Sequence, residues 1–265
     1  MKIRIWAAAA SLVLFAALLS SCHNQAAESV KLQGAGASFP APLYNKWFKS
    51  YSAAHDNVQV DYQSVGSGSG KKSVIDHTVD FGASDAAMTD EEMARVPGGV
   101  QLLPMTAGAI VIAYHVDGVN SLKLSRKAYA GIFLGKIKRW NDPAITASNP
   151  GVKLPDLPVN VVVRADSSGT SFVFSKHLSA ISPEFNKAVG ANTMPNWPVG
   201  TKSKGNEGVT SSLKTTPGAI GYVEYGYAKS QKLTPRRWKT SPVNSWTPPR
   251  PPVRQPWPPP SCQPT

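Results

Sequence analysis

The sequence predicts an α/β protein, and two observations carry that prediction. Between residues 30 and 231, short runs rich in β-branched and aromatic residues alternate with amphipathic stretches of helical period. Strands that alternate with helices favour sheets covered by helices. The chain has 265 residues, of which 42% are hydrophobic. This length is enough for one large domain or two of modest size with a buried core.

The expected strands are short, and the expected helices separate them. We predict strands over residues 58–65, 80–83, 109–116, 159–165 and 219–225. We predict helices over residues 42–54, 70–77, 125–134, 170–178 and 206–214. No internal repeat is visible in the sequence.

An export signal precedes the region of alternating elements. Residues 1–21 start with Lys2 and Arg4 and continue into an apolar run. This run is shorter than the roughly 20 residues that a membrane-spanning helix needs, so we expect it to be removed. The residues before Cys22 are typical of a bacterial lipobox, which leaves a lipid anchor at Cys22 and simple secretion as alternatives. Both place the mature chain in the periplasm or cell envelope. The other cysteine, Cys262, gives no basis for a disulfide framework.

The C-terminal segment, residues 229–265, differs in composition from the rest of the chain. Eleven of the 23 prolines fall between Pro235 and Pro264. Proline fixes φ and removes a backbone donor, so we expect this segment to be disordered or polyproline II. It is either a genuine Pro-rich tail or a segment translated out of frame.

The formal net charge of +12 is not evidence for a nucleic-acid partner. Residues 232–265 hold six basic residues and no acidic residue, which leaves a balance of only +4 over residues 22–231. A nucleic-acid-binding domain would instead concentrate basic residues within its folded part.

Three loops share one layout, in which an extended run ends in small or hydroxyl residues and a helix follows. They are residues 34–40, 66–70 and 164–170. A helix N-terminus has unpaired N–H groups and a partial positive charge, so it binds oxyanions. If the three loops meet, they can surround one tetrahedral anion. A single loop of this kind is more often an ordinary turn with a capping serine.

Seven motifs in order resemble the phosphate-specific substrate-binding proteins of bacterial ABC importers. They are GAGASFPAPLY (34–44), YQSVGSGSG (62–70), DFGASDAAMT (80–89), LGKIKRWNDPAI (134–145), RADSSGTSFVF (164–174), KGNEGV (204–209) and PGAIGYVEYGYA (217–228). The resemblance covers roughly residues 30–231. It implies a receptor that binds inorganic phosphate and delivers it to the transmembrane subunits of an ABC permease.

The resemblance also implies which residues hold the anion. The phosphate-binding residues would be Ser38, Phe39, Ser67, Asp85, Arg164, Ser168, Gly169 and Thr170, with Asp166 orienting Arg164. Phe39 would contribute its backbone N–H. Ser38 occupies a position where many relatives have threonine, and the hydroxyl is kept.

Asp85 indicates which anion fits the implied site. A carboxylate repels an anion unless the ligand has a proton to donate. Hydrogen phosphate has such a proton near neutral pH and sulfate does not, so sulfate would leave Asp85 unpaired. We therefore expect phosphate to be preferred.

The fold implied by the resemblance is a two-domain periplasmic-binding-protein fold with the ligand in the interdomain cleft. Residues 29–105 would form the N-terminal part of domain one and residues 106–228 domain two. The C-terminal part of domain one is expected to be missing. We expect a monomer without enzymatic activity, cofactor or metal ion. The alternatives are a binder of sulfate, molybdate or arsenate, a non-functional truncated product, and a secreted phosphoester hydrolase, for which no metal cluster or activated nucleophile is visible.

Overall fold

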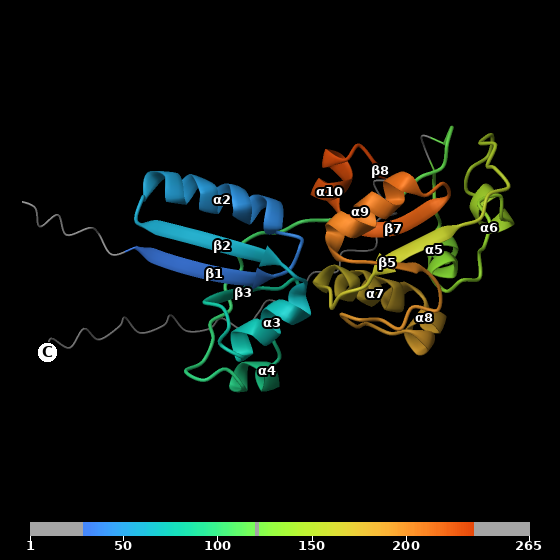
Figure 1. Cartoon of the computed structure of the whole chain (residues 1–265). Coiled ribbons are helices and arrows are strands. Elements are labelled where there is room, and N and C mark those ends of the chain that lie inside the picture. Colours follow the sequence, from blue (N-terminus) through green and yellow to red (C-terminus); the bar gives the residue numbers. More distant parts are fainter. Residues whose placement is uncertain (1–28, 120–121, 236–265) are drawn as a thin grey trace, which may run out of the picture.

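The computed structural model describes residues 29–119 and 122–235. Over these residues the chain forms two lobes, each built on its own β-sheet (Figure 1). The signal at residues 1–21, the expected lipidation site Cys22 and residues 236–265 of the Pro-rich segment lie outside the described part. None of the described helices is long and apolar enough to cross a membrane.

The first lobe has a parallel sheet of three strands in the order β2-β1-β3. The strands are β1 (Val30–Gly36), β2 (Val58–Ser64) and β3 (Phe81–Ala83). The helices are α2 (Ala41–Ala54), α3 (Ser67–Ile75) and α4 (Asp90–Ala94). Helix α2 lies on one side of the sheet and α3 on the other (Figure 1).

The register of the first sheet places its strand ends together. Residues 30–36 of β1 pair in order with residues 58–64 of β2, so both strands finish at one edge. The last residues of β1 also pair with β3. An aromatic group supports this sheet, with the rings of Tyr44 and Tyr62 edge to face at 5.4 Å. The loops that follow the three strands therefore lie side by side, where open α/β folds bind ligands.

The second lobe has a mixed sheet in the order β6-β5-β7-β4-β8. Strand β5 is parallel to β6 and β7, whereas β4 is antiparallel to β7 and β8. The strands are β4 (Ile110–Tyr114), β5 (Asn160–Arg164), β6 (Thr201–Ser203), β7 (Ala219–Glu224) and β8 (Thr234–Pro235). The helices are α5 (Arg126–Phe133), α6 (Pro143–Thr146), α7 (Gly169–Ile181), α8 (Pro183–Ala188), α9 (Gly205–Thr215) and α10 (Tyr225–Ser230).

Apolar side chains cover both faces of the second sheet. Successive residues of a strand point to opposite faces. On β7, Ile220 and Tyr222 join a cluster with α5 and α7, whereas Ala219 and Val223 join a cluster with α9 and α10. The strands are buried on both sides, which fixes the loops at their ends.

The structure extends the folded part beyond the predicted boundary at residue 229. Helix α10 continues to Ser230, and β8 then pairs with β4. Leu233 is 8% exposed and belongs to the cluster under α9 and α10. The prediction that residues 229–235 are disordered is therefore wrong, because Leu233 contributes an apolar side chain to the core.

The predicted strands and long helices are present, with shifts at their ends. Helix α3 starts at Ser67 rather than at residue 70, directly after the N-cap residue Gly66, whose φ of +96° lies outside the helical range. The short helices α4, α6, α8 and α10 and the strands β1, β6 and β8 were not predicted as elements from the sequence.

Candidate anion site between the lobes

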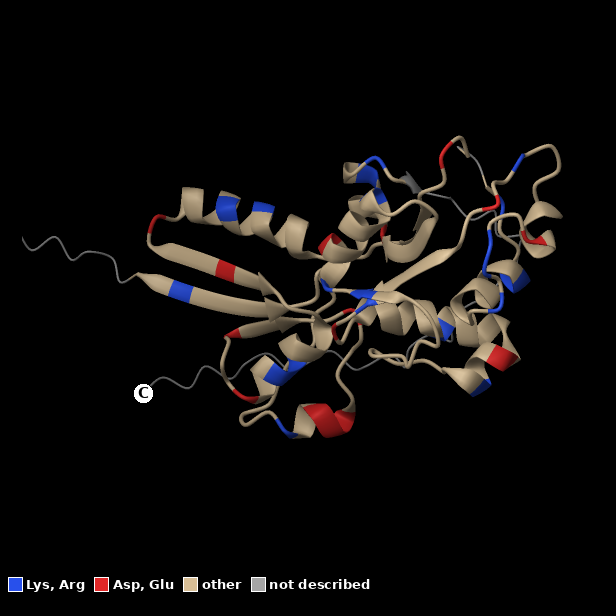
Figure 2. Ribbon diagram, turned by 45° about the vertical axis from the view of Figure 1, so that its right-hand side comes forward, with Lys and Arg blue, Asp and Glu red and all other residues tan. Residues whose placement is uncertain are grey.

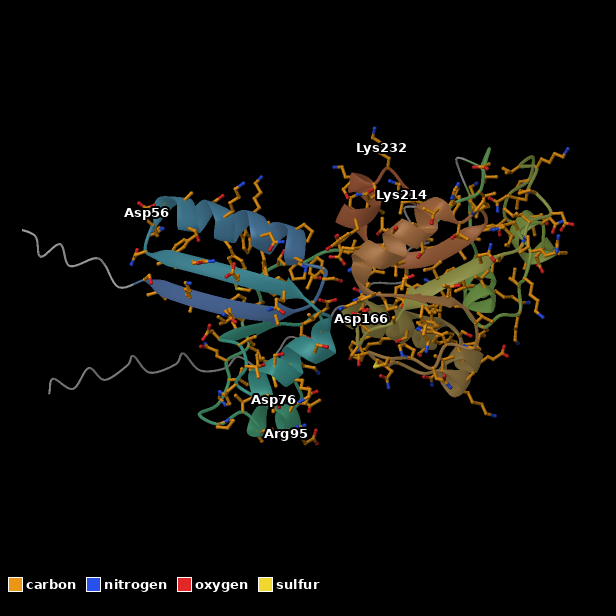
Figure 3. All side chains as sticks on the ribbon, viewed as in Figure 1. Asp56, Asp76, Arg95, Asp166, Lys214 and Lys232 are labelled. Carbon is orange, nitrogen blue, oxygen red and sulfur yellow. The ribbon has the colours of Figure 1, made fainter. Side chains whose placement is uncertain are left out.

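The predicted anion-binding residues follow the carboxyl ends of four strands. Ser38 and Phe39 follow β1, Ser67 follows β2 and Asp85 follows β3. Arg164 is the last residue of β5, and its loop leads into α7 at Gly169. The first lobe and the second lobe meet at these loops, and Figure 3 shows Asp166 at this junction.

Arg164 is a buried cation held in one orientation. Its side chain is 2% exposed, and it donates from Nε to Asp166 Oδ1 at 2.8 Å and from Nη2 to Asp166 Oδ2 at 2.5 Å. Burial alone would raise the pKa of Asp166, but the bonds from Arg164 outweigh burial and hold that pKa below its usual value. Two charge-assisted hydrogen bonds thus join Asp166 to Arg164, and the role of Asp166 in orienting Arg164 stays a prediction.

Asp85 and Arg164 meet through Thr170. The hydroxyl of Thr170 accepts from Arg164 Nη1 at 3.4 Å and donates to Asp85 Oδ2 at 3.3 Å. Asp85 belongs to the first lobe and the other two residues to the second. The carboxylate and the guanidinium therefore share one site, although they lie in different lobes.

Burial raises the pKa of Asp85 from 3.8 to about 6. The Thr170 hydrogen bond and the charge of Arg164 lower this pKa, and the charges of Asp166 and Glu224 raise it. Asp85 Oδ1 is buried and has no hydrogen-bond partner among the described residues. This oxygen can accept a hydrogen bond from a ligand that carries a proton.

Ser67 and Gly169 form a second contact between the lobes. The Gly169 N–H donates to Ser67 Oγ at 3.1 Å, and the Asp85 N–H donates to the same oxygen at 3.3 Å. A Cβ on Gly169 would lie 2.5 Å from Asp85 Cβ, so no larger residue fits without movement. Nearby, the Gly68 N–H donates to Ser167 O at 3.0 Å.

Ser168 is the N-cap residue of helix α7. It is fully buried, and its hydroxyl accepts from the Ser171 N–H at 3.1 Å as a helix cap. Its O–H remains available as a donor. The N-terminus of α7, with its partial positive charge, is thus directed at the junction that holds Arg164 and Thr170.

Ser38 contacts Asn206, a residue without a predicted role. Its hydroxyl accepts from both the backbone and the side chain of Asn206, the second residue of α9. The preceding residue, Gly205, donates its N–H to Asp166 Oδ1 at 3.0 Å. Gly205 and Asn206 both lie in the KGNEGV motif, which is the feature of the sequence that could have indicated their role. Tyr227, also without a predicted role, donates from its hydroxyl to Ser38 O at 2.6 Å.

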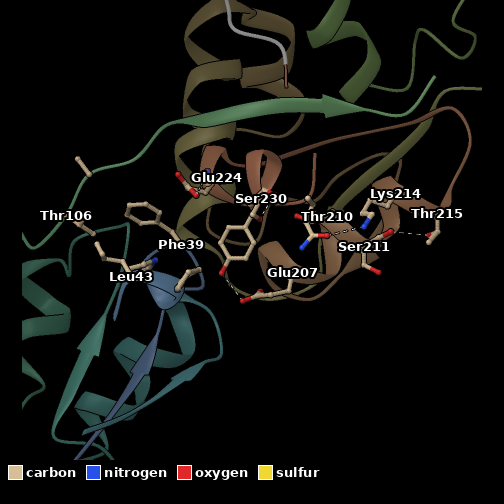
Figure 4. A pocket seen from close by; sticks show the side chains of 16 residues that line it. Phe39, Leu43, Thr106, Glu207, Thr210, Ser211, Lys214, Thr215, Glu224 and Ser230 are labelled. Carbon is tan, nitrogen blue, oxygen red and sulfur yellow. Dashed lines mark hydrogen bonds between the residues drawn. The ribbon is translucent and has the colours of Figure 1, made fainter. Parts of the chain in front are cut away.

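A cavity of about 630 Å³ lies beside this junction. Its walls come from the start of α2, from residues 106 and 107, and from α9 and α10 (Figure 4). Phe39 lines it, but Asp85, Arg164 and Thr170 do not. Of the predicted anion-binding residues, Phe39 alone lines this cavity.

Charged residues outside the site are dispersed. Figure 2 shows Lys and Arg on both lobes and interspersed with Asp and Glu. Among the described residues, no group of three or more His, Cys, Asp or Glu side chains could hold a metal ion. Within the part of the chain that the structure describes, a cation, a helix N-terminus, hydroxyls and a protonatable carboxylate meet at the junction of the two lobes.

Two α/β lobes that meet at polar loops are an arrangement found in periplasmic binding proteins, which close around a ligand by hinge motion. A family model described as the PBP superfamily domain matches residues 23–246. The chain is 44% identical over 209 residues to the phosphate-binding protein PstS of Xylella fastidiosa, which covers 78% of this chain and 57% of the relative. It is 33% identical over 264 residues to the phosphate-binding protein PstS 3 of Mycobacterium leprae, covering 91% of this chain and 71% of the relative.

A solved structure agrees with this fold. The phosphate ABC transporter substrate-binding protein with bound phosphate from Clostridium perfringens superposes with a TM-score of 0.57 at 18% identity, covering 76% of this chain and 73% of that chain. The chain therefore belongs to the PBP superfamily and, within it, to the PstS phosphate-binding proteins. It spans 57% of the Xylella fastidiosa relative's length.

Proposed function

We propose that this protein binds inorganic phosphate between its two lobes and delivers it to an ABC-type importer in the cell envelope. The observation that carries the proposal is the Asp85–Thr170–Arg164 contact, which joins a proton acceptor and a cation across the junction. Hydrogen phosphate needs both, since it is an anion with a proton to donate. The names of the relatives in Xylella fastidiosa and Mycobacterium leprae support this ligand.

The proposed phosphate ligands are the residues that the family resemblance implies. Arg164 and the N-terminus of α7, with Ser168, Gly169 and Thr170, would hold the anion from the second lobe. Ser38, the Phe39 N–H, Ser67 and Asp85 would hold it from the first. Opening would separate residues 29–105 from residues 106–228 by a hinge motion at the connecting chain, and release the phosphate.

The remaining parts of the proposal concern location and partners. The protein would act as a monomer in the periplasm, either free or anchored through a lipid on Cys22. Its partners would be the transmembrane subunits of the permease. Catalysis has no part in this function, because capture and release leave the phosphate unchanged.

Titration calorimetry on the purified chain, freed of phosphate, tests the proposal. We expect one phosphate per chain, and sulfate binding about ten-thousandfold weaker because sulfate leaves Asp85 without a donor. Sulfate binding as tight as phosphate binding would refute the assigned role of Asp85. Absence of phosphate binding by a chain that melts cooperatively would refute the proposed function.

A further inference from the structure

Asn206 joins the two lobes at the edge of the anion site. It is fully buried at the start of α9, and it contacts Ser38, which lies 168 positions earlier in the chain and is 2% exposed. The Asn206 side chain donates from Nδ2 to Ser38 Oγ at 2.8 Å, and its backbone N–H donates to the same oxygen at 3.1 Å.

The orientation of the Asn206 amide is fixed by a backbone group. Its Oδ1 accepts from the Glu224 N–H at 2.9 Å. A backbone N–H can only donate, so the oxygen of the amide must face Glu224 and the nitrogen must face Ser38. The direction of the Asn206–Ser38 hydrogen bond follows from this arrangement.

The Ser38 hydroxyl is thereby left with one remaining function. A serine hydroxyl has two acceptor lone pairs and one proton to donate. Asn206 supplies two N–H donors to the oxygen, so both lone pairs are occupied. The O–H must then be directed at another acceptor, and an anion at the junction of the lobes is such an acceptor.

We propose that Asn206 is a positioning residue that fixes Ser38 as a hydrogen-bond donor to the anion and does so only when the lobes are closed. The proposal rests on the proposed function, since it concerns the same site. It assigns a role to Asn206, which had no predicted role. It also states that the Ser38 hydroxyl is fixed as a donor only when the lobes are closed. In an open arrangement Ser38 would lose both N–H donors, because Asn206 belongs to the other lobe.

A double-mutant cycle on phosphate affinity tests the proposal. We expect Asn206→Ala to weaken phosphate binding about tenfold and Ser38→Ala about tenfold or more, as for hydrogen bonds to a charged group. If Asn206 acts through the Ser38 hydroxyl, Asn206→Ala should change affinity by less than about twofold in the Ser38→Ala background. Equal effects of Asn206→Ala in both backgrounds would overturn the proposal.

Two further variants separate positioning from a general effect on α9. Thr210→Val removes a buried hydroxyl that donates to Asn206 O at 2.6 Å within the same helix, and phosphate affinity should stay within about twofold. Asn206→Asp keeps an oxygen for the Glu224 N–H but offers Ser38 a carboxylate acceptor. It should weaken phosphate binding more than Asn206→Ala, since the Ser38 proton then turns away from the anion.

The outcomes distinguish this inference from the proposed function. Phosphate binding by the unmodified chain with additive Asn206 and Ser38 effects would refute the inference alone. A Thr210→Val loss equal to that of Asn206→Ala would also refute it, because α9 as a whole would then be responsible. No phosphate binding by the folded, unmodified chain would refute the proposed function and this inference with it.

Discussion

Replacing Asp85 by asparagine should change how the stability of the ligand-free protein depends on pH. Burial raises the pKa of Asp85 from 3.8 to about 6 in the folded chain. Because this pKa is raised, the folded state holds the proton more tightly than the unfolded state. The resulting stabilisation is present at low pH and is lost as the pH rises through about 6.

The magnitude follows from the shift of about two pKa units. Each unit corresponds to about 1.4 kcal/mol, so the full shift is worth about 3 kcal/mol. The unfolded group is already partly ionised at pH 4, so ionising Asp85 lowers the free energy of unfolding by about 2.5 kcal/mol between pH 4 and pH 7.5. Asp85→Asn has no carboxyl to ionise at this position. The free energy of unfolding of the variant minus that of the unmodified chain should therefore rise by about 2.5 kcal/mol over this range. Any constant cost of burying the amide cancels from the change with pH.

Urea unfolding in phosphate-free buffers at several pH values measures this difference. Asp56→Asn, at an exposed turn before β2, is the matched control for the substitution itself. In calorimetry, Asp85→Asn should also narrow the gap between phosphate and sulfate affinity, since the proton acceptor is gone. If the difference in the free energy of unfolding between the variant and the unmodified chain stays constant within about 0.5 kcal/mol from pH 4 to pH 7.5, the assignment of a buried carboxyl with a raised pKa at Asp85 is refuted.

Three other substitutions test the site and the core. Arg164→Lys should weaken phosphate binding about a hundredfold, because lysine cannot make two hydrogen bonds to Asp166 and bind the anion as well. A loss of affinity below about threefold in calorimetry would contradict this. Gly169→Ala should weaken phosphate binding at least tenfold, since its Cβ would lie 2.5 Å from Asp85 Cβ in the closed arrangement, and unchanged affinity would show that the lobes adjust. Leu233→Ala should lower the free energy of unfolding by about 2 to 4 kcal/mol, measured with urea, and no loss would place residue 233 outside the core.

Local sequence patterns predicted the elements with strong periodicity and missed the short ones. The strand at β7 was predictable from a buried apolar run, and α9 from its amphipathic pattern. Helix α4 is a single short helix held by a capping box between Thr89 and Glu92, which outweighs its weak periodicity. Helix α10 starts directly after β7, where Glu224 accepts from the Gly226 N–H, so the chain turns without a loop residue that would mark the boundary.

The family resemblance supplied a set of candidate residues but not their contacts. It gave Arg164 and Asp85 as expected ligands and Asp166 as the residue expected to orient Arg164. The Asn206–Ser38 contact spans 168 positions, and no local pattern indicates which buried amide meets which hydroxyl. Only the packing of α9 against the first lobe brings them together.

The contacts between the lobes differ in kind from those within them, and this difference suits a reversible closure. Core side chains such as Tyr222 and Leu213 stay within the second lobe. The lobes themselves are joined by hydrogen bonds such as Gly68 to Ser167 and Asn206 to Ser38. Each such bond contributes only about 1 kcal/mol net, because water replaces it on opening. At neutral pH the buried Asp85 carboxylate opposes closure, since burial raises its pKa to about 6. A ligand that brings both a proton for Asp85 and negative charge for Arg164 removes that opposition, so closure should be favoured by a protonated oxyanion and not by a fully ionised one.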